Sequence, residues 1–117
     1  MTNGVTDLSA GEVKAKLEAG EIVLVDVRTP LEFVSGHIPG ALLFPLPVFD
    51  PAKLSLDAGR PYVFYCAGGV RSDHAAQAAL PFCPAGTAHL KGGISAWAQE
   101  GFAIQSMDPK TGEPMPV

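Results

Sequence analysis

Basic residues are scarce in this sequence, and no stretch of it stays apolar for the length of a membrane span. Lysine and arginine together number 8 among 117 residues, against 12 aspartates and glutamates, and the formal net charge is −4. Because these few cations form no cluster, we expect neither nucleic acid nor an anionic membrane surface as the main partner. The opening residues, MTNGVTDLSAGEVKAK, hold no apolar signal-peptide core, so we expect a cytoplasmic protein.

Cysteine is also scarce, with Cys66 and Cys83 the only two in the chain. A cytoplasmic chain is expected to keep both as thiols. The helix expected between them covers residues 72–80 and would be roughly 13 Å long, whereas a disulfide needs Cα atoms within about 7 Å of each other. We therefore expect no disulfide and no catalytic role for Cys83.

Motifs for metal or nucleotide binding are missing as well. The three histidines, His37, His74 and His89, have no further ligand at metal-binding spacing. Neither GxGxxG nor GxxxxGK[ST] occurs, which removes the commonest sites for nucleotide phosphates. The sequence predicts no metal and no organic cofactor.

The residues that are present predict one α/β domain. Hydrophobic residues make up 47% of the chain, enough for a single core. Capping boxes beginning at Ser9 and Thr29 each predict the start of a helix, and the apolar run 21–27 predicts a strand buried on both faces. Strands and helices then alternate, with strands expected at 41–44, 62–66 and 87–90 and helices at 72–80 and 94–99. We expect residues 1–105 to form the domain and the proline-rich residues 106–117 to be a surface-wrapping or mobile C-terminal tail.

Cys66 stands at the end of an expected strand, in the stretch YCAGGVRSDHAAQAAL. In a parallel sheet the carboxyl ends of the strands carry the ligand sites. Gly68 and Gly69 allow positive φ, so the amides of residues 67–72 can curl around a common centre that holds an anion. The N-terminus of the following helix adds to the same field. These features predict a stabilised, reactive thiolate rather than an inert core cysteine.

Three separated motifs resemble the signatures of the rhodanese-like domains. They are LVDVRTPLEFVSGHIPGA at 24–41, CAGGVRS at 66–72 and LKGGISAWAQEGF at 90–102, and with their spacing they cover residues 5–104. The resemblance implies a three-layer fold with a five-stranded, mainly parallel central sheet flanked by helices. It also implies that Cys66 is the nucleophile, which accepts sulfane sulfur as a persulfide. Ala67, Gly68, Gly69, Val70 and Arg71 would then bind the substrate through loop amides and one charge.

The length of the loop separates two reactions on this scaffold. Related cell-cycle phosphatases have five residues between the cysteine and the arginine, whereas four stand between Cys66 and Arg71. The shorter loop favours a sulfur atom over a phosphate. We therefore expect a sulfurtransferase that moves sulfur from thiosulfate, mercaptopyruvate or a persulfide to a thiol or cyanide. A sulfur-relay or protein-interaction module without small-molecule turnover is the alternative, and a cysteine phosphatase or arsenate reductase is disfavoured.

Other positions receive supporting roles by the same resemblance and by their place in the chain. Asp26 and Arg28 end the first buried strand on the rim that carries Cys66, and we expect Asp26 to be neutralised by arginine or by backbone donors. His37, in GHIPG, is expected to hold a loop, and Trp97 to anchor a helix on the sheet. Arg71 has two open roles, binding an anionic donor or closing the loop through a salt bridge.

Overall fold

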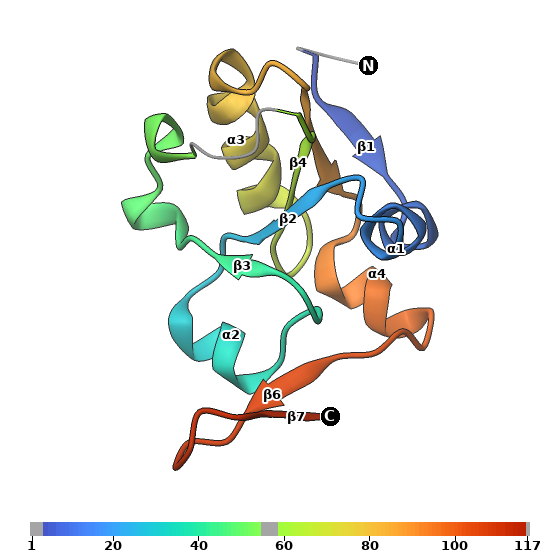
Figure 1. Ribbon diagram of the computed structural model, residues 1–117, viewed down its shortest axis with the longest axis vertical. Helices are drawn as coiled ribbons and strands as arrows, with labels where there is room; N and C mark the ends of the chain where they lie inside the picture. The colour runs from blue at the N-terminus through green and yellow to red at the C-terminus, as the bar shows by residue number, and fades with distance from the viewer. Residues whose placement is uncertain (1–3, 55–58, 117) are drawn as a thin grey trace.

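The structure, a computed structural model, describes residues 4–54 and 59–116. Five strands form one parallel sheet in the order β1-β5-β4-β2-β3 (Figure 1). The strands of this sheet are β1 (Thr6–Leu8), β2 (Val23–Asp26), β3 (Leu42–Leu43), β4 (Tyr62–Tyr65) and β5 (Thr87–Leu90). The helices are α1 (Ala10–Glu18), α2 (Pro30–Ser35), α3 (Val70–Ala79) and α4 (Gly93–Gln99), with short 3-10 turns η1 (Leu46–Val48), η2 (Pro51–Lys53) and η3 (Leu80–Phe82). The five-stranded α/β fold expected from the sequence is confirmed.

Two apolar layers lie on opposite faces of the sheet because successive side chains of a strand point to opposite sides. In β4, Val63 and Tyr65 join the layer that contains Val13 of α1 and Trp97 of α4. Tyr62 and Phe64 join the other layer, which lies under α3. All four residues of β4 are buried, as the central strand of a sheet covered on both faces requires.

The helix starts follow the local signals of the sequence. Ser9 and Thr29 each accept a hydrogen bond from the amide three residues on, and the glutamates at 12 and 32 complete both capping boxes. Pro30 occupies the first turn of α2. The helix α3 begins at Val70, two residues earlier than expected, because Gly69 caps it with a left-handed φ of 116°.

The edge strand β1 was not predicted from the sequence. It has three residues, and only Leu8 among them is buried. So short and exposed a segment lacks the apolar alternation that identifies a strand. It nevertheless pairs with β5, and this pairing places Asp7 opposite His89.

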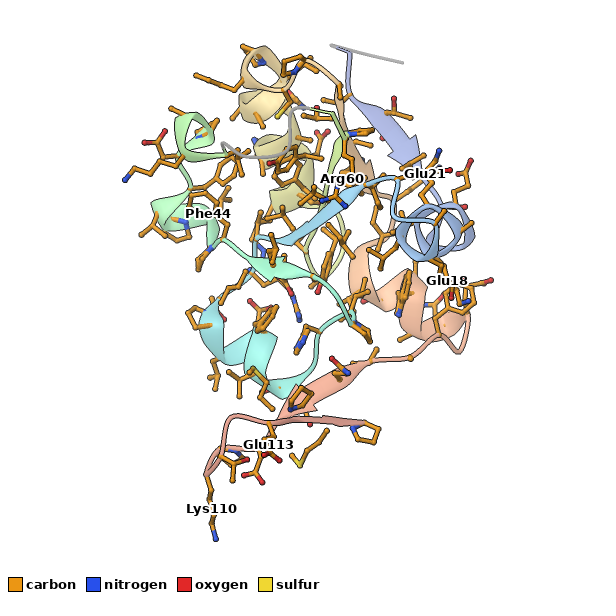
Figure 2. The ribbon with its side chains drawn as sticks, viewed as in Figure 1. Glu18, Glu21, Phe44, Arg60, Lys110 and Glu113 are labelled. Carbon is orange, nitrogen blue, oxygen red and sulfur yellow. The ribbon has the colours of Figure 1, made fainter. Side chains whose placement is uncertain are left out.

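The C-terminal residues form an antiparallel hairpin of β6 (Gln105–Met107) and β7 (Pro114–Pro116). The hairpin joins the body of the fold through reciprocal backbone hydrogen bonds between His37 and Gln105. Its turn carries Lys110, which points away from the sheet (Figure 2). The division of the chain at residue 105 stays a prediction. Within the described ranges, no helix has the length and apolar character needed to cross a membrane.

Candidate active site

Cys66 follows β4 directly and lies at the carboxyl edge of the sheet. Its side chain is only 2% exposed and packs in the apolar layer under α3. The loop of residues 67–69 then turns the chain into α3, so that the first turn of the helix faces the sulfur. The expected position of the cysteine at the end of a central parallel strand is therefore what the structure has.

Three polar groups surround the sulfur of Cys66. The amides of Gly69 and Ser72 donate to Sγ at 3.1 Å and 3.4 Å, and Ser72 Oγ, which lies 3.6 Å from Sγ, accepts from the thiol. Burial raises the pKa of the Cys66 thiol, but hydrogen bonds from Ser72, Gly69 and the Arg71 amide outweigh burial and lower the pKa overall. Hydrogen bonds to the charged form favour that form, so the arrangement stabilises a thiolate.

Glycines in two separate motifs allow the backbone of the active loop to curl around the Cys66 sulfur. Gly69 has φ of 116°, whereas Gly68 is not among the glycines with positive φ, so only one of the two loop glycines uses the freedom expected for both. Gly93, with φ of 62°, lies against the carbonyl oxygens of Cys66 and Ala67, where a Cβ atom would collide with both. Next to it, the amide of Ile94 donates to the Cys66 carbonyl at 2.9 Å. Gly93 of LKGGISAW thus allows the start of α4 to pack against the backbone of the active loop and to hydrogen-bond it.

The remaining loop residues differ in exposure and in charge. Ala67 is half-buried, Gly68 is exposed, and the side chain of Val70 is 73% exposed. Arg71 forms a two-pronged ion pair with Glu32 of α2, with N···O distances of 3.0 Å and 3.2 Å. The hydrogen bonds from Arg71 are the largest influence on the pKa of Glu32, which is lowered to about 2. Of the two roles left open for Arg71, the geometry favours closing the loop.

Asp26 and Arg28 form a buried pair beneath the loops. The guanidinium of Arg28 bonds both carboxylate oxygens of Asp26, at 2.7 Å to 3.1 Å, and the Arg28 amide donates to the same carboxylate at 2.9 Å. The expectation that Asp26 is neutralised is confirmed. Arg28 also donates to the carbonyl of Gly36 at 2.6 Å, so the pair ties β2 to the end of α2. Both side chains support the loops, and none of these hydrogen bonds involves Cys66.

The other singled-out residues have structural contacts. His37 stacks on Phe33 and its Nδ1 lies 2.8 Å from the Phe33 carbonyl, consistent with a loop-holding role. Trp97 is buried and donates from Nε1 to the Ala103 carbonyl, which confirms it as an anchor of α4. Both cysteines are free thiols, as expected, and the structure buries both. No group of three potential metal ligands occurs among residues 4–54 and 59–116.

Two contacts of the site were not identified from the sequence. The first is the hydroxyl of Ser72, of which only the amide was expected to face the sulfur. The second is His89 of β5, whose Nδ1 lies 3.2 Å from Ser72 Oγ and whose Nε2 lies 2.8 Å from Oδ1 of Asp7. The strand register that brings Asp7 and His89 together was the missing signal, because β1 was not recognised as a strand.

Comparisons with known proteins agree with this arrangement. A sulfurtransferase of Allochromatium vinosum is 34% identical over 104 residues, which cover 89% of this chain and 95% of that protein. An uncharacterised protein of Synechocystis is 42% identical over 81 residues, or 69% of this chain, and the match spans only 45% of that relative's length. The crystal structure of a thiosulfate sulfurtransferase from Pseudomonas aeruginosa superposes with a TM-score of 0.77 at 29% identity, covering 87% of this chain and 20% of that one.

The model of one protein family, described as the rhodanese-like domain, matches residues 9–100. This range contains the first two motifs that carried the resemblance, the active loop among them, and the third motif as far as residue 100. Sequence, fold and relatives thus agree that this chain belongs to the family of rhodanese-like domains, which includes sulfurtransferases.

Proposed function

We propose that this chain is a sulfurtransferase in which Cys66 carries sulfane sulfur as a persulfide. The observation that carries the proposal is the convergence of the Gly69 and Ser72 amides on Cys66 Sγ, with Ser72 Oγ 3.6 Å away, within a loop that has four residues between Cys66 and Arg71. Donors so close to one sulfur stabilise a thiolate, which is the nucleophilic form of cysteine. The sulfurtransferase name of the Allochromatium relative supports the same assignment.

The reaction has two balanced steps of thiolate exchange. The Cys66 thiolate first attacks the outer sulfur of the donor, an S–S bond forms, and the donor's own S–S bond breaks. The leaving group, a thiolate or sulfite, departs with the electron pair of that bond. An acceptor thiolate or cyanide then attacks the outer sulfur of the Cys66 persulfide and releases the Cys66 thiolate. Neither step calls for a metal or an organic cofactor.

The charge of the loop bears on the choice of donor. Residues 67–70 are Ala, Gly, Gly and Val, so Arg71 is the only charged side chain in the loop. Because this guanidinium is engaged by Glu32, it offers little net positive charge to a dianion such as thiosulfate. We therefore propose a persulfide with low charge as the better donor and a thiol, free or on a relay protein, as the acceptor.

An assay of three reactions tests the assignment. Wild type and Cys66→Ala are incubated with thiosulfate and cyanide, then with a persulfide donor and a thiol acceptor, and finally with a phosphate ester. We expect sulfur transfer by wild type, none by Cys66→Ala, and no phosphatase activity. Equal transfer by Cys66→Ala would refute the role of Cys66, and sulfur loading without turnover of any small donor would favour the relay module instead.

A further inference from the structure

The hydroxyl of Ser72 has three hydrogen-bond partners but only one proton to donate. Ser72 is fully buried, and its Oγ lies 3.1 Å from the Gly69 carbonyl, 3.2 Å from His89 Nδ1 and 3.6 Å from Cys66 Sγ. A hydroxyl donates one hydrogen bond and accepts two. The partner that receives the Ser72 proton therefore depends on whether His89 accepts or donates.

Asp7 determines which nitrogen of His89 carries a proton. Oδ1 of Asp7 lies 2.8 Å from His89 Nε2, and an ionised carboxylate can only accept, so Nε2 bears hydrogen. This leaves Nδ1 with a lone pair in the neutral ring and with a hydrogen in the imidazolium. The parallel register of β1 and β5 fixes the contact by setting Asp7 opposite His89.

The protonation of His89 reverses the direction of the Ser72 hydrogen bond. In the neutral ring, Nδ1 accepts the Ser72 proton, and Ser72 Oγ can then only accept from a protonated Cys66 thiol. In the imidazolium, Nδ1–H donates to Ser72 Oγ, which frees the Ser72 proton for the sulfur. An anionic sulfur is a stronger acceptor than the competing Gly69 carbonyl, so the freed proton favours the thiolate.

We propose that Asp7, His89 and Ser72 form a hydrogen-bond relay in which His89 is a positioning residue that turns the Ser72 hydroxyl toward the Cys66 sulfur. The inference rests on the proposed function only in naming that sulfur as the reacting atom. Among residues 4–54 and 59–116, the titratable side chains hydrogen-bonded to His89 or Ser72 are Asp7 on β1 and Cys66 at the end of β4. The β4 residue that pairs with His89 is Phe64, which carries no charge.

The test measures alkylation of Cys66 by iodoacetamide across pH, which needs no sulfur donor and so separates this inference from the proposed function. All variants carry Cys83→Ala, so that Cys66 is the one thiol present. In the otherwise unaltered relay, we expect the rate to rise in two steps, because two coupled groups titrate. With His89→Phe we expect a single step and a rate about tenfold lower at neutral pH, as for one lost hydrogen bond to a charged sulfur.

Two further variants distinguish positioning from general damage to the fold. His89→Asn retains an N–H that can donate to Ser72 Oγ without titrating, so we expect a single step with a rate closer to that of the unaltered relay. His74→Asn changes an exposed histidine on α3 outside the relay, and we expect both steps to remain. Loss of a step in His74→Asn equal to that in His89→Asn would overturn the proposal.

A double-mutant cycle supplies the decisive comparison. If His89 acts through Ser72, adding His89→Phe to Ser72→Ala should slow alkylation no further. A double variant slower than Ser72→Ala by the whole factor of His89→Phe would contradict the relay. The relay would also be contradicted if His89→Phe showed the same two-step pH profile and the same alkylation rate as the unaltered relay. The fluorescence of Trp97, which is buried between α4 and the sheet, confirms in each case that the variant is folded.

Discussion

Replacing Gly93 by alanine should displace the active loop. A residue with φ near +60° and a Cβ atom costs about 1–2 kcal/mol, and the Gly93 backbone has φ of 62°. The new Cβ would also collide with the carbonyl oxygens of Cys66 and Ala67, which are backbone atoms that cannot rotate away. Overpacking of this kind adds about 1–3 kcal/mol. We therefore expect Gly93→Ala to lower the free energy of unfolding by about 2–5 kcal/mol.

Gly101→Ala is the matched control for this prediction. Gly101 has φ of 78°, close to that of Gly93, but a Cβ there would meet nothing within 4 Å. Its substitution should cost only the backbone term of about 1–2 kcal/mol. Urea unfolding followed by the fluorescence of the single tryptophan, Trp97, measures both values. Alkylation of Cys66 should also slow in Gly93→Ala and stay unchanged in Gly101→Ala. Equal losses of stability with unchanged alkylation in both variants would refute the role of Gly93 in holding the loop.

The charged pairs give the remaining predictions. Glu32→Gln should release Arg71 toward the donor and lower the KM for thiosulfate about two- to fivefold, as expected for a partly exposed ion pair. The control Glu12→Gln, which changes the glutamate of the other capping box, should leave this KM unchanged. Steady-state kinetics of the two variants and wild type measure the difference. Since the pKa of Glu32 is lowered to about 2, the contribution of ionised Glu32 to stability is complete above about pH 4.3 and is lost as the pH falls toward 2. Between these pH values, the unfolding free energy of Glu32→Gln should therefore fall less steeply with decreasing pH than that of wild type. An identical dependence on pH in acid unfolding would contradict the pair. Asp26→Asn should cost about 3–5 kcal/mol in urea unfolding because it leaves the buried charge of Arg28 uncompensated, and a loss below about 1 kcal/mol would contradict that reading.

Features with a local signal could be read from the sequence. Both capping boxes form as expected at Ser9 and Thr29, because their partners are three residues away in the chain. The place of Cys66 follows from one buried strand and one glycine-rich turn. The strand 87–90 was expected with the bounds that β5 has. Burial, capping and turn chemistry act over a few residues, so a short sequence window contains the pattern that predicts them.

Features that depend on distant pairing could not be read in the same way. The contact between Asp7 and His89 joins residues 82 positions apart and requires the register of an exposed edge strand. The pair of Arg71 and Glu32 spans 39 positions, so the sequence left the role of Arg71 open between substrate binding and loop closure. The collision that Gly93 avoids likewise exists only once α4 packs behind the active loop. These contacts arise from tertiary packing, which no short sequence window contains.

The most direct test of the account is the mass of the protein after incubation with a persulfide donor and removal of excess reagent. We predict that wild type gains the mass of one sulfur atom, that peptide mapping places this sulfur on Cys66, and that an added thiol removes it with release of the acceptor persulfide. Cys83→Ala should behave like wild type and Cys66→Ala should gain nothing. An unmodified Cys66 under these conditions, or sulfur that remains on the protein in Cys66→Ala, would contradict the account.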